Sequence, residues 1–193
     1  MHRRFIPLGL IVFRFALAPV LLVASFHGGK TAAPWLAILL LLGVASDIFD
    51  GIIARRLGCA TDKLRRLDSQ TDAVFWLAVL LSTILMDPAW LRAHILGIAL
   101  LLMMEAACYL FSFWRFRRET CTHSYLSKAW GLALTAAFTA LWLGSPLAEP
   151  LWCICVVLGL VSQLEVLAIL ALLPHWQRDI PNLLTAWRIR RGA

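Results

Sequence analysis

The sequence predicts an all-α membrane protein with six transmembrane helices, and three observations support this fold class. Apolar residues make up 61% of the 193 residues and charged residues only 15%, and mean hydropathy is +0.80. A soluble globular protein averages about 45–50% apolar and about 25% charged residues. Apolar stretches of a length suited to crossing a bilayer also recur along the chain. This composition excludes a soluble enzyme, a disordered tail and a secreted disulfide scaffold.

Six apolar stretches follow one another, and turn-forming residues separate them. The first begins behind Arg3 and Arg4 and could be mistaken for a signal peptide. Its apolar region is too long for one and contains Arg14, so we expect a retained helix. Pairs such as Gly28-Gly29 and Asp87-Pro88 mark later breaks. The predicted spans, in order, are Phe5–Phe26, Trp35–Asp50, Leu67–Met86, Leu91–Trp114, Ala129–Gly144 and Leu151–Leu173.

The lysines and arginines predict the orientation. Fifteen of the 18 fall in one set of loops and termini, two (Lys30 and Arg92) fall in the opposite set, and Arg14 lies within a span. Because positive charge is enriched in cytoplasmic loops, we expect both termini on the cytoplasmic side of a bacterial-type inner membrane. These loops also explain the net charge of +7, so no nucleic-acid partner is expected.

One domain is expected over the whole chain. Residues 1–193 would form a single six-helix transmembrane domain, because no stretch outside the spans is long enough for a soluble domain. Residues 174–193 mix tryptophan with arginine. This mixture predicts a cytoplasmic tail that lies at the membrane interface on anionic lipid.

Four of the seven aspartates lie at the predicted cytoplasmic ends of the second and third spans. A carboxylate within a span costs about 2.5–3.5 kcal/mol, so this group needs a compensating partner. At about 100° per residue, Asp47 and Asp50 share one arc of a helix. Asp68 and Asp72 are four residues apart and share a face of the next helix. The short connection through Gly58 makes the two helices antiparallel neighbours, so we expect the two faces to meet.

Converging carboxylates repel one another unless divalent cations neutralise them. Oxygen ligands suit Mg²⁺, Mn²⁺ or Ca²⁺ rather than zinc or copper, and two ions held by four carboxylates are typical of phosphoryl chemistry. Gly51 and Ala54 lie in the arc of the first two aspartates and leave room for a flat or phosphorylated ligand. Arg55 supplies a forked cation for phosphate oxygens.

These residues resemble a known signature. Asp-x-x-Asp-Gly-x-x-Ala-Arg, eight further residues and then Gly-x-x-x-Asp-x-x-x-Asp is the pattern of the CDP-alcohol phosphotransferase family, also called the CDP-alcohol phosphatidyltransferase family. Every spacing is kept here, but Leu64 stands where the family has its second glycine. Pro7, Arg14 and Pro19 resemble the family's first helix, and residues 123–131 resemble the loop that enters its fifth helix. The matching residues are Asp47, Asp50, Gly51, Ala54, Arg55, Asp68 and Asp72.

The resemblance implies a fold and an activity. The fold would be the six-helix bundle of the family, in a homodimer with one cytoplasm-facing active site per protomer. The activity would be transfer of a phosphoalcohol group, expected to be phosphatidyl, from a CDP-linked donor to a hydroxyl acceptor in phospholipid biosynthesis, with release of CMP. CDP-diacylglycerol is the expected donor and a soluble CDP-alcohol the alternative. Serine, glycerol phosphate, inositol phosphate, choline or a second lipid all fit as the acceptor.

The resemblance also implies roles for single residues. Asp47, Asp50 and Asp68 would be metal ligands, with two Mg²⁺ or Mn²⁺ ions per site. Asp72 would bind the second ion and act as the general base, because a carboxylate beside the metal pair can accept the proton that the acceptor hydroxyl loses. The cytidine diphosphate would contact four positions: Gly51, Ala54, Arg55 and Leu64.

Candidate acceptor-binding residues are Lys128, Arg118 and His123. The family commonly has a lysine near the acceptor at the position of Lys128. Arg118, with Arg115 and Arg117, has the alternative role of setting the topology, and His123 has the alternative of an ordinary loop histidine.

The sequence allows more than one role for Arg14 and for the aspartates. Arg14 could extend to the cytoplasmic interface or pair with an aspartate of the cluster. The aspartates could belong to a membrane protein that handles divalent cations, or to a relative that binds CDP-linked lipid without turnover. Ion uptake without CMP release would indicate the first, and donor binding without CMP release the second.

Overall fold

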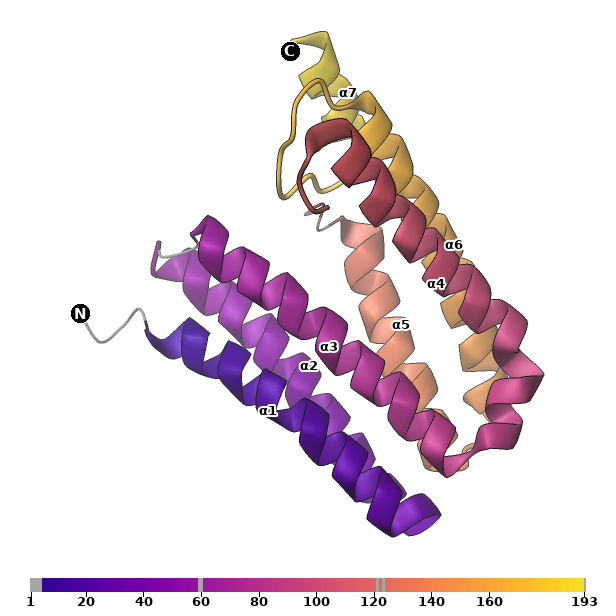
Figure 1. Cartoon of the computed structure of the whole chain (residues 1–193). Helices are drawn as coiled ribbons and strands as arrows, with labels where there is room; N and C mark the ends of the chain where they lie inside the picture. Colours follow the sequence, from indigo (N-terminus) through magenta and orange to yellow (C-terminus); the bar gives the residue numbers. More distant parts are fainter. Residues whose placement is uncertain (1–4, 59–60, 121, 123, 193) are drawn as a thin grey trace. The chain divides into compact units, whose positions relative to one another are not determined.

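A computed structural model describes residues 5–58, 61–120, 122 and 124–192, and every regular element in these residues is a helix. Six long helices correspond to the six predicted apolar stretches, which confirms the all-α fold class. A single turn of 3₁₀ helix (η2) and a short C-terminal helix (α7) complete the chain (Figure 1). The elements are α1 (Phe5–Gly28), η2 (Gly29–Ala32), α2 (Ala33–Arg56), α3 (Asp62–Met86), α4 (Pro88–Phe116), α5 (Tyr125–Trp142), α6 (Ala148–Leu172) and α7 (Leu183–Arg191).

Four helical segments of the described chain are long and apolar enough to cross a membrane. The first comprises α1, η2 and α2 together, and the other three correspond to α3, α4 and α6. The 18-residue α5 is not among them, so the count of six spans stays a prediction. The four segments are Phe5–Arg56, Lys63–Met86, Pro88–Phe116 and Ala148–Leu172.

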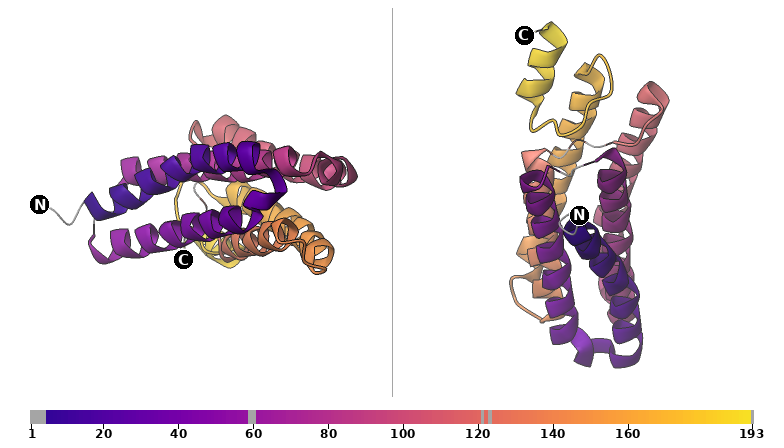
Figure 2. Two further views of the ribbon diagram at one scale, coloured as in Figure 1. Left: turned by 90° about the horizontal axis from the view of Figure 1, so that it is seen from below. Right: turned by 90° about the vertical axis from the view of Figure 1, so that its left-hand side faces the viewer.

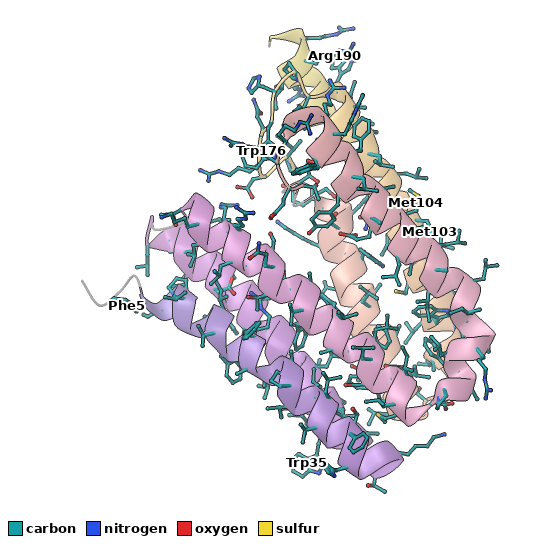
Figure 3. All side chains as sticks on the ribbon, in the orientation of Figure 1. Phe5, Trp35, Met103, Met104, Trp176 and Arg190 are labelled. Atoms are coloured by element: carbon teal, nitrogen blue, oxygen red, sulfur yellow. The ribbon has the colours of Figure 1, made fainter. Side chains whose placement is uncertain are left out.

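The helices form two compact units. Unit 1 comprises Met1–Ala93 and Phe138–Pro146, and unit 2 comprises His94–Ala137 and Leu147–Ala193. In unit 1, α1 packs along both α2 and α3, and the three helices lie side by side (Figure 2). Leu21, Leu36 and Val79 are fully buried in this unit. Phe5, the first residue of α1, and Trp35, in the first turn of α2, both point outward (Figure 3).

Capping residues set the turn between α2 and α3. Gly58 has a φ of +61°, a left-handed conformation that favours glycine, and its N–H donates to the Arg55 carbonyl at 3.2 Å, which ends α2. The Thr61 hydroxyl then accepts the Leu64 N–H at 3.3 Å and starts α3 at Asp62. The helix therefore includes Leu64 and extends beyond the apolar stretch predicted from Leu67, because a capping residue rather than the first apolar residue determines its start.

Asp87 connects α3 to α4. Its Oδ1 accepts the Trp90 N–H at 3.1 Å, and Pro88 occupies the first position of α4, where a missing N–H costs nothing. Lys30 of η2 pairs with Oδ2 of Asp87 at 3.2 Å. The Trp90 N–H and then the Lys30 ammonium hold the pKa of Asp87 below its ordinary value. The turn between α1 and α2 thus lies at the same end of unit 1 as the α3–α4 junction.

Close approach of α2 and α3 depends on Gly43. A Cβ at this position would lie 2.1 Å from Cζ of Phe75, whose ring is buried, so the ring would have to shift. Gly43→Ala should therefore lower the apparent Tm in detergent, since overpacking costs about 1–3 kcal/mol and outweighs the gain of about 1 kcal/mol in helix propensity. Gly9→Ala is the matched control, because no atom lies within 4 Å of its added Cβ. An equal Tm for both variants would show that α2 and α3 do not meet there.

In unit 2, α7 folds back on α6. Ala186 of α7 is fully buried with Ile169 and Leu173, together with Ile180 from the preceding loop. Two sets of contacts mark the two ends of this unit. At one end His94 of α4 lies 2.9 Å from Glu149 of α6, and at the other Arg115 donates to the Leu173 carbonyl at 3.1 Å.

A polar chain also runs between α4 and α6 in unit 2. The Gln163 amide donates to the Glu105 carboxylate and accepts the Cys108 thiol at 3.2 Å. The partner of Glu105 therefore lies on another helix. Gln163 is 58 residues from Glu105 in the sequence, so only the packing of α6 against α4 brings the two side chains together.

Candidate active site

Four aspartates surround one arginine in unit 1. Arg14, on α1, is fully buried. Its Nη1 donates to Asp47 and Asp72. Its Nη2 donates to Asp68 and, at 2.8 Å, to Oδ2 of Asp50. The four hydrogens of the two η nitrogens thus serve four different carboxylates, while Nε has no hydrogen-bond partner among the described residues.

The cluster has a closed end and an open end. The side chains of Arg14 and Asp50 are 1% and 4% exposed, whereas those of Asp47, Asp68 and Asp72 are 41%, 20% and 30% exposed. The guanidinium therefore lies at the closed end with Asp50, and the other three carboxylates are partly exposed.

The expected meeting of the α2 and α3 faces is observed, and α1 takes part in it. Carboxylate oxygens of Asp47, Asp50 and Asp68 all lie within 4.8 Å of one another. Because α1 packs along both α2 and α3, the two acidic faces converge on its Arg14. Of the two roles open for Arg14, the structure shows pairing, with all four aspartates.

The oxygen-only donor set fits a hard divalent cation. Each aspartate gives one oxygen to Arg14 and has a second carboxylate oxygen. A single guanidinium carries one positive charge against four carboxylates, so the cluster favours further positive charge. Mg²⁺ and Mn²⁺ prefer such ligands.

The expected donor-binding residues lie beside this cluster. Gly51 and Ala54 follow Asp50 on α2, and Ala54 is buried. A Cβ on Gly51 would lie 3.5 Å from Nη1 of Arg55, so the arginine extends back over the glycine. Arg55 is exposed and near enough to Asp50 for their charges to interact. Leu64 is half-buried in the first turn of α3, one turn before Asp68.

The expected acceptor-binding residues belong to unit 2. Lys128 lies in the first turn of α5 with its Nζ 5.7 Å from the centre of the Tyr125 ring. The Arg118 guanidinium lies over the Trp176 ring at 4.9 Å. His123 is outside the described residues. Both cations rest on aromatic rings and stay candidates for binding an anionic ligand.

Comparison with known families decides the class. A family model described as CDP-alcohol phosphatidyltransferase matches residues 4–172, most of the chain. The chain belongs to this family. No curated protein and no solved structure was found to match. As a family member the protein is an integral membrane transferase that moves a phosphoalcohol group from a CDP-alcohol.

The aspartate cluster agrees with the metal use of the CDP-alcohol phosphatidyltransferase family. The family uses divalent metal, and the Asp47–Asp50–Asp68 group can hold an ion. Sequence reasoning did not place Arg14 among the site residues. The available signal was a charged residue in an otherwise apolar helix, which marks a functional position by default.

Proposed function

We propose that this CDP-alcohol phosphatidyltransferase family member transfers a phosphatidyl group from CDP-diacylglycerol to a hydroxyl acceptor in phospholipid biosynthesis, with release of CMP. The convergence of four aspartates at the partly exposed end of a membrane helix unit carries the proposal. The family match supports the reaction type. The long apolar helices support a lipid-linked donor, which would enter from the bilayer.

The chain's own residues divide the work between the two substrates. Arg55, exposed beside Gly51, would bind the diphosphate oxygens through its planar fork. Gly51 and Ala54, with little or no side chain, would let the nucleotide approach the α2 backbone. Asp72, the 30% exposed carboxylate of α3, would accept the proton of the acceptor hydroxyl as that oxygen attacks phosphorus.

Two Mg²⁺ or Mn²⁺ ions are part of the proposal. Asp47, Asp50 and Asp68 would hold the first ion, and Asp72 would contribute to the second. When bound, such ions neutralise charge on the transferred phosphoryl group and the departing CMP. Lys128 and Arg118, with His123, would bind an anionic acceptor.

One experiment tests the proposal directly. Purified protein is incubated with CDP-diacylglycerol, a divalent cation and one acceptor at a time, and the lipid product is identified by mass. We expect one acceptor to give a phosphatidyl product and an equal amount of CMP. If product forms only from a soluble CDP-alcohol, that compound and not CDP-diacylglycerol is the donor. If the protein carries Mn²⁺ into proteoliposomes without releasing CMP, its function is ion handling and not group transfer.

The orientation is proposed as well. Both termini and the active site would face the cytoplasm of a bacterial-type cell, in a homodimer. Successive helices would cross the membrane in opposite directions. Two contacts support this, because each joins helix ends that are predicted to lie on the outer side: Lys30 with Asp87, and His94 with Glu149. The cytoplasmic tail would rest on anionic lipid, because Leu184 and Trp187 of α7 are exposed beside three arginines and Arg190 projects outward (Figure 3).

Cysteine labelling checks this topology. Lys30 and Lys63 are both exposed loop or helix-end lysines, so they form a matched pair for replacement by cysteine in a cysteine-free chain. An impermeant maleimide applied to intact cells should label Lys30→Cys and leave Lys63→Cys unlabelled until the cells are opened. The reverse pattern would place the aspartates on the outer side, away from the cytoplasmic nucleotide pool.

Leu64 should determine how the donor fits. It lies one turn before Asp68, where a side chain narrows the space left by a glycine. Leu64→Gly should change donor KM or donor choice and leave Mn²⁺ affinity nearly unchanged. Leu67→Gly controls for the loss of about 1 kcal/mol of helix propensity, because Leu67 lies on the exposed part of the same helix. Identical donor profiles for wild type and Leu64→Gly would show that Leu64 does not contact the nucleotide.

A further inference from the structure

Arg14 makes contacts that differ from those of an ordinary intramembrane arginine. Such arginines normally pair with an acid or with backbone carbonyls, or extend to the interface. Here a fully buried guanidinium contacts every aspartate of the site through separate hydrogens. Because no carboxylate receives both hydrogens of a fork, the arrangement shares one cation among four ligands instead of forming one strong pair.

We infer that Arg14 is a built-in counter-ion that assembles the four aspartates without metal and weakens their affinity for divalent cations. This inference rests on the proposed function only in requiring that the aspartates bind a divalent cation. It assigns to α1 a role in regulating metal affinity.

The first part follows from repulsion. Asp50 is almost inaccessible to water and lies beside the carboxylates of Asp47 and Asp68. Like charges at this distance repel strongly where water is excluded. The guanidinium offsets part of this repulsion, so it holds the α2 and α3 faces together before any ion binds.

The second part follows from competition. Arg14 takes one oxygen from each aspartate, and its positive charge repels an incoming cation within the same poorly hydrated cluster. A neutral side chain of similar length would release those four oxygens and leave the negative charge uncompensated. Metal would then bind more tightly, while the metal-free protein would become less stable. Bound metal would in turn raise the stability of the variant, because a ligand stabilises the state that binds it.

The test measures Mn²⁺ binding and stability, without any turnover assay. Wild type, Arg14→Met, Arg14→Lys and Arg56→Met are purified in detergent, stripped of metal and titrated with Mn²⁺ by calorimetry. Arg14→Met should bind Mn²⁺ with a Kd at least about tenfold lower than wild type, and its metal-free Tm should fall. The Kd and the metal-free Tm of Arg14→Lys should lie between those of wild type and Arg14→Met, because one ammonium has three hydrogens for four carboxylates. Arg56→Met, which removes an exposed arginine from the end of α2, should match wild type.

A double variant separates charge balance from simple packing. Adding Asp47→Asn to Arg14→Met removes one of the repelling carboxylates, so the metal-free Tm should rise above that of Arg14→Met alone. Failure of this rescue would overturn the first part. If wild type binds Mn²⁺ and Arg14→Met binds it no more tightly, the second part is overturned while the metal site stands. Absence of Mn²⁺ binding by wild type would remove the metal site and this inference with it. If Arg14→Met cannot be isolated without metal, Arg14→Lys carries the same comparison with wild type.

Discussion

Asp72→Asn should lower turnover by at least about 10²–10⁴-fold, because asparagine has nearly the same size but cannot accept the proton of the acceptor hydroxyl. It also removes one negative charge from the metal-binding cluster. Folding should survive, since the carboxamide oxygen can still accept the Nη1 hydrogen of Arg14 and repulsion within the cluster decreases. CMP release per enzyme, measured with saturating donor and acceptor, gives the turnover.

Asp87→Asn is the matched control for that variant. It makes the same chemical change at the other end of α3, where Asp87 caps α4 and pairs with Lys30. Asparagine is also a good helix cap, so turnover should stay near that of wild type. Near wild-type turnover by Asp72→Asn, with its Tm unchanged, would exclude Asp72 as the base.

Removal of divalent metal should abolish turnover. After EDTA treatment and desalting, CMP release should fall by at least about 10²-fold, since the ions would supply several kcal/mol of charge stabilisation in the transition state. Mg²⁺ or Mn²⁺ should restore it, and Zn²⁺ should not, because four carboxylates form an oxygen-only site suited to hard ions.

The chelation experiment needs a structural control. Protein passed through the same desalting column without EDTA should keep its activity. The EDTA-treated protein should remain folded, because Arg14 pairs with all four aspartates without metal. Full turnover in protein whose measured Mg²⁺ and Mn²⁺ content is far below one ion per chain would contradict a metal-dependent reaction.

Helical periodicity was sufficient to predict the aspartate cluster. Asp47 and Asp50 share an arc of α2, and the four-residue spacing of Asp68 and Asp72 puts both on one face of α3. The structure brings three of these carboxylates within 4.8 Å of one another. Local spacing predicts such a cluster well, because each pair of acids lies within one or two turns of a helix.

The contribution of α1 could not be predicted in the same way. Arg14 lies in a helix that is apolar on all sides, so no periodic pattern indicates which side faces α2 and α3. Its contacts join residues 33 to 58 positions apart, and only tertiary packing determines them.

The acceptor remained unidentified for a related reason. Two of the residues expected to bind it, Arg118 and Lys128, lie before α5 and in its first turn. They are far in sequence from the aspartates and have no fixed spacing to them. Helical periodicity relates residues within one helix and gives no distance between separate helices. The family match determines the donor class but not the acceptor alcohol.

CMP release by the purified protein is the most direct measurement of phosphoalcohol transfer at the aspartate cluster. Wild type and Asp72→Asn are supplied with CDP-diacylglycerol, Mg²⁺ or Mn²⁺ and a mixture of serine, glycerol phosphate, inositol phosphate and choline. Wild type should release CMP in step with a new phosphatidyl product, and omission of the donor, the cation or the acceptors should stop it. Asp72→Asn should release at least about 10²-fold less. Equal CMP release by the two proteins, or Mn²⁺ binding by wild type with no CMP from any CDP-linked donor, would contradict phosphoalcohol transfer at this site.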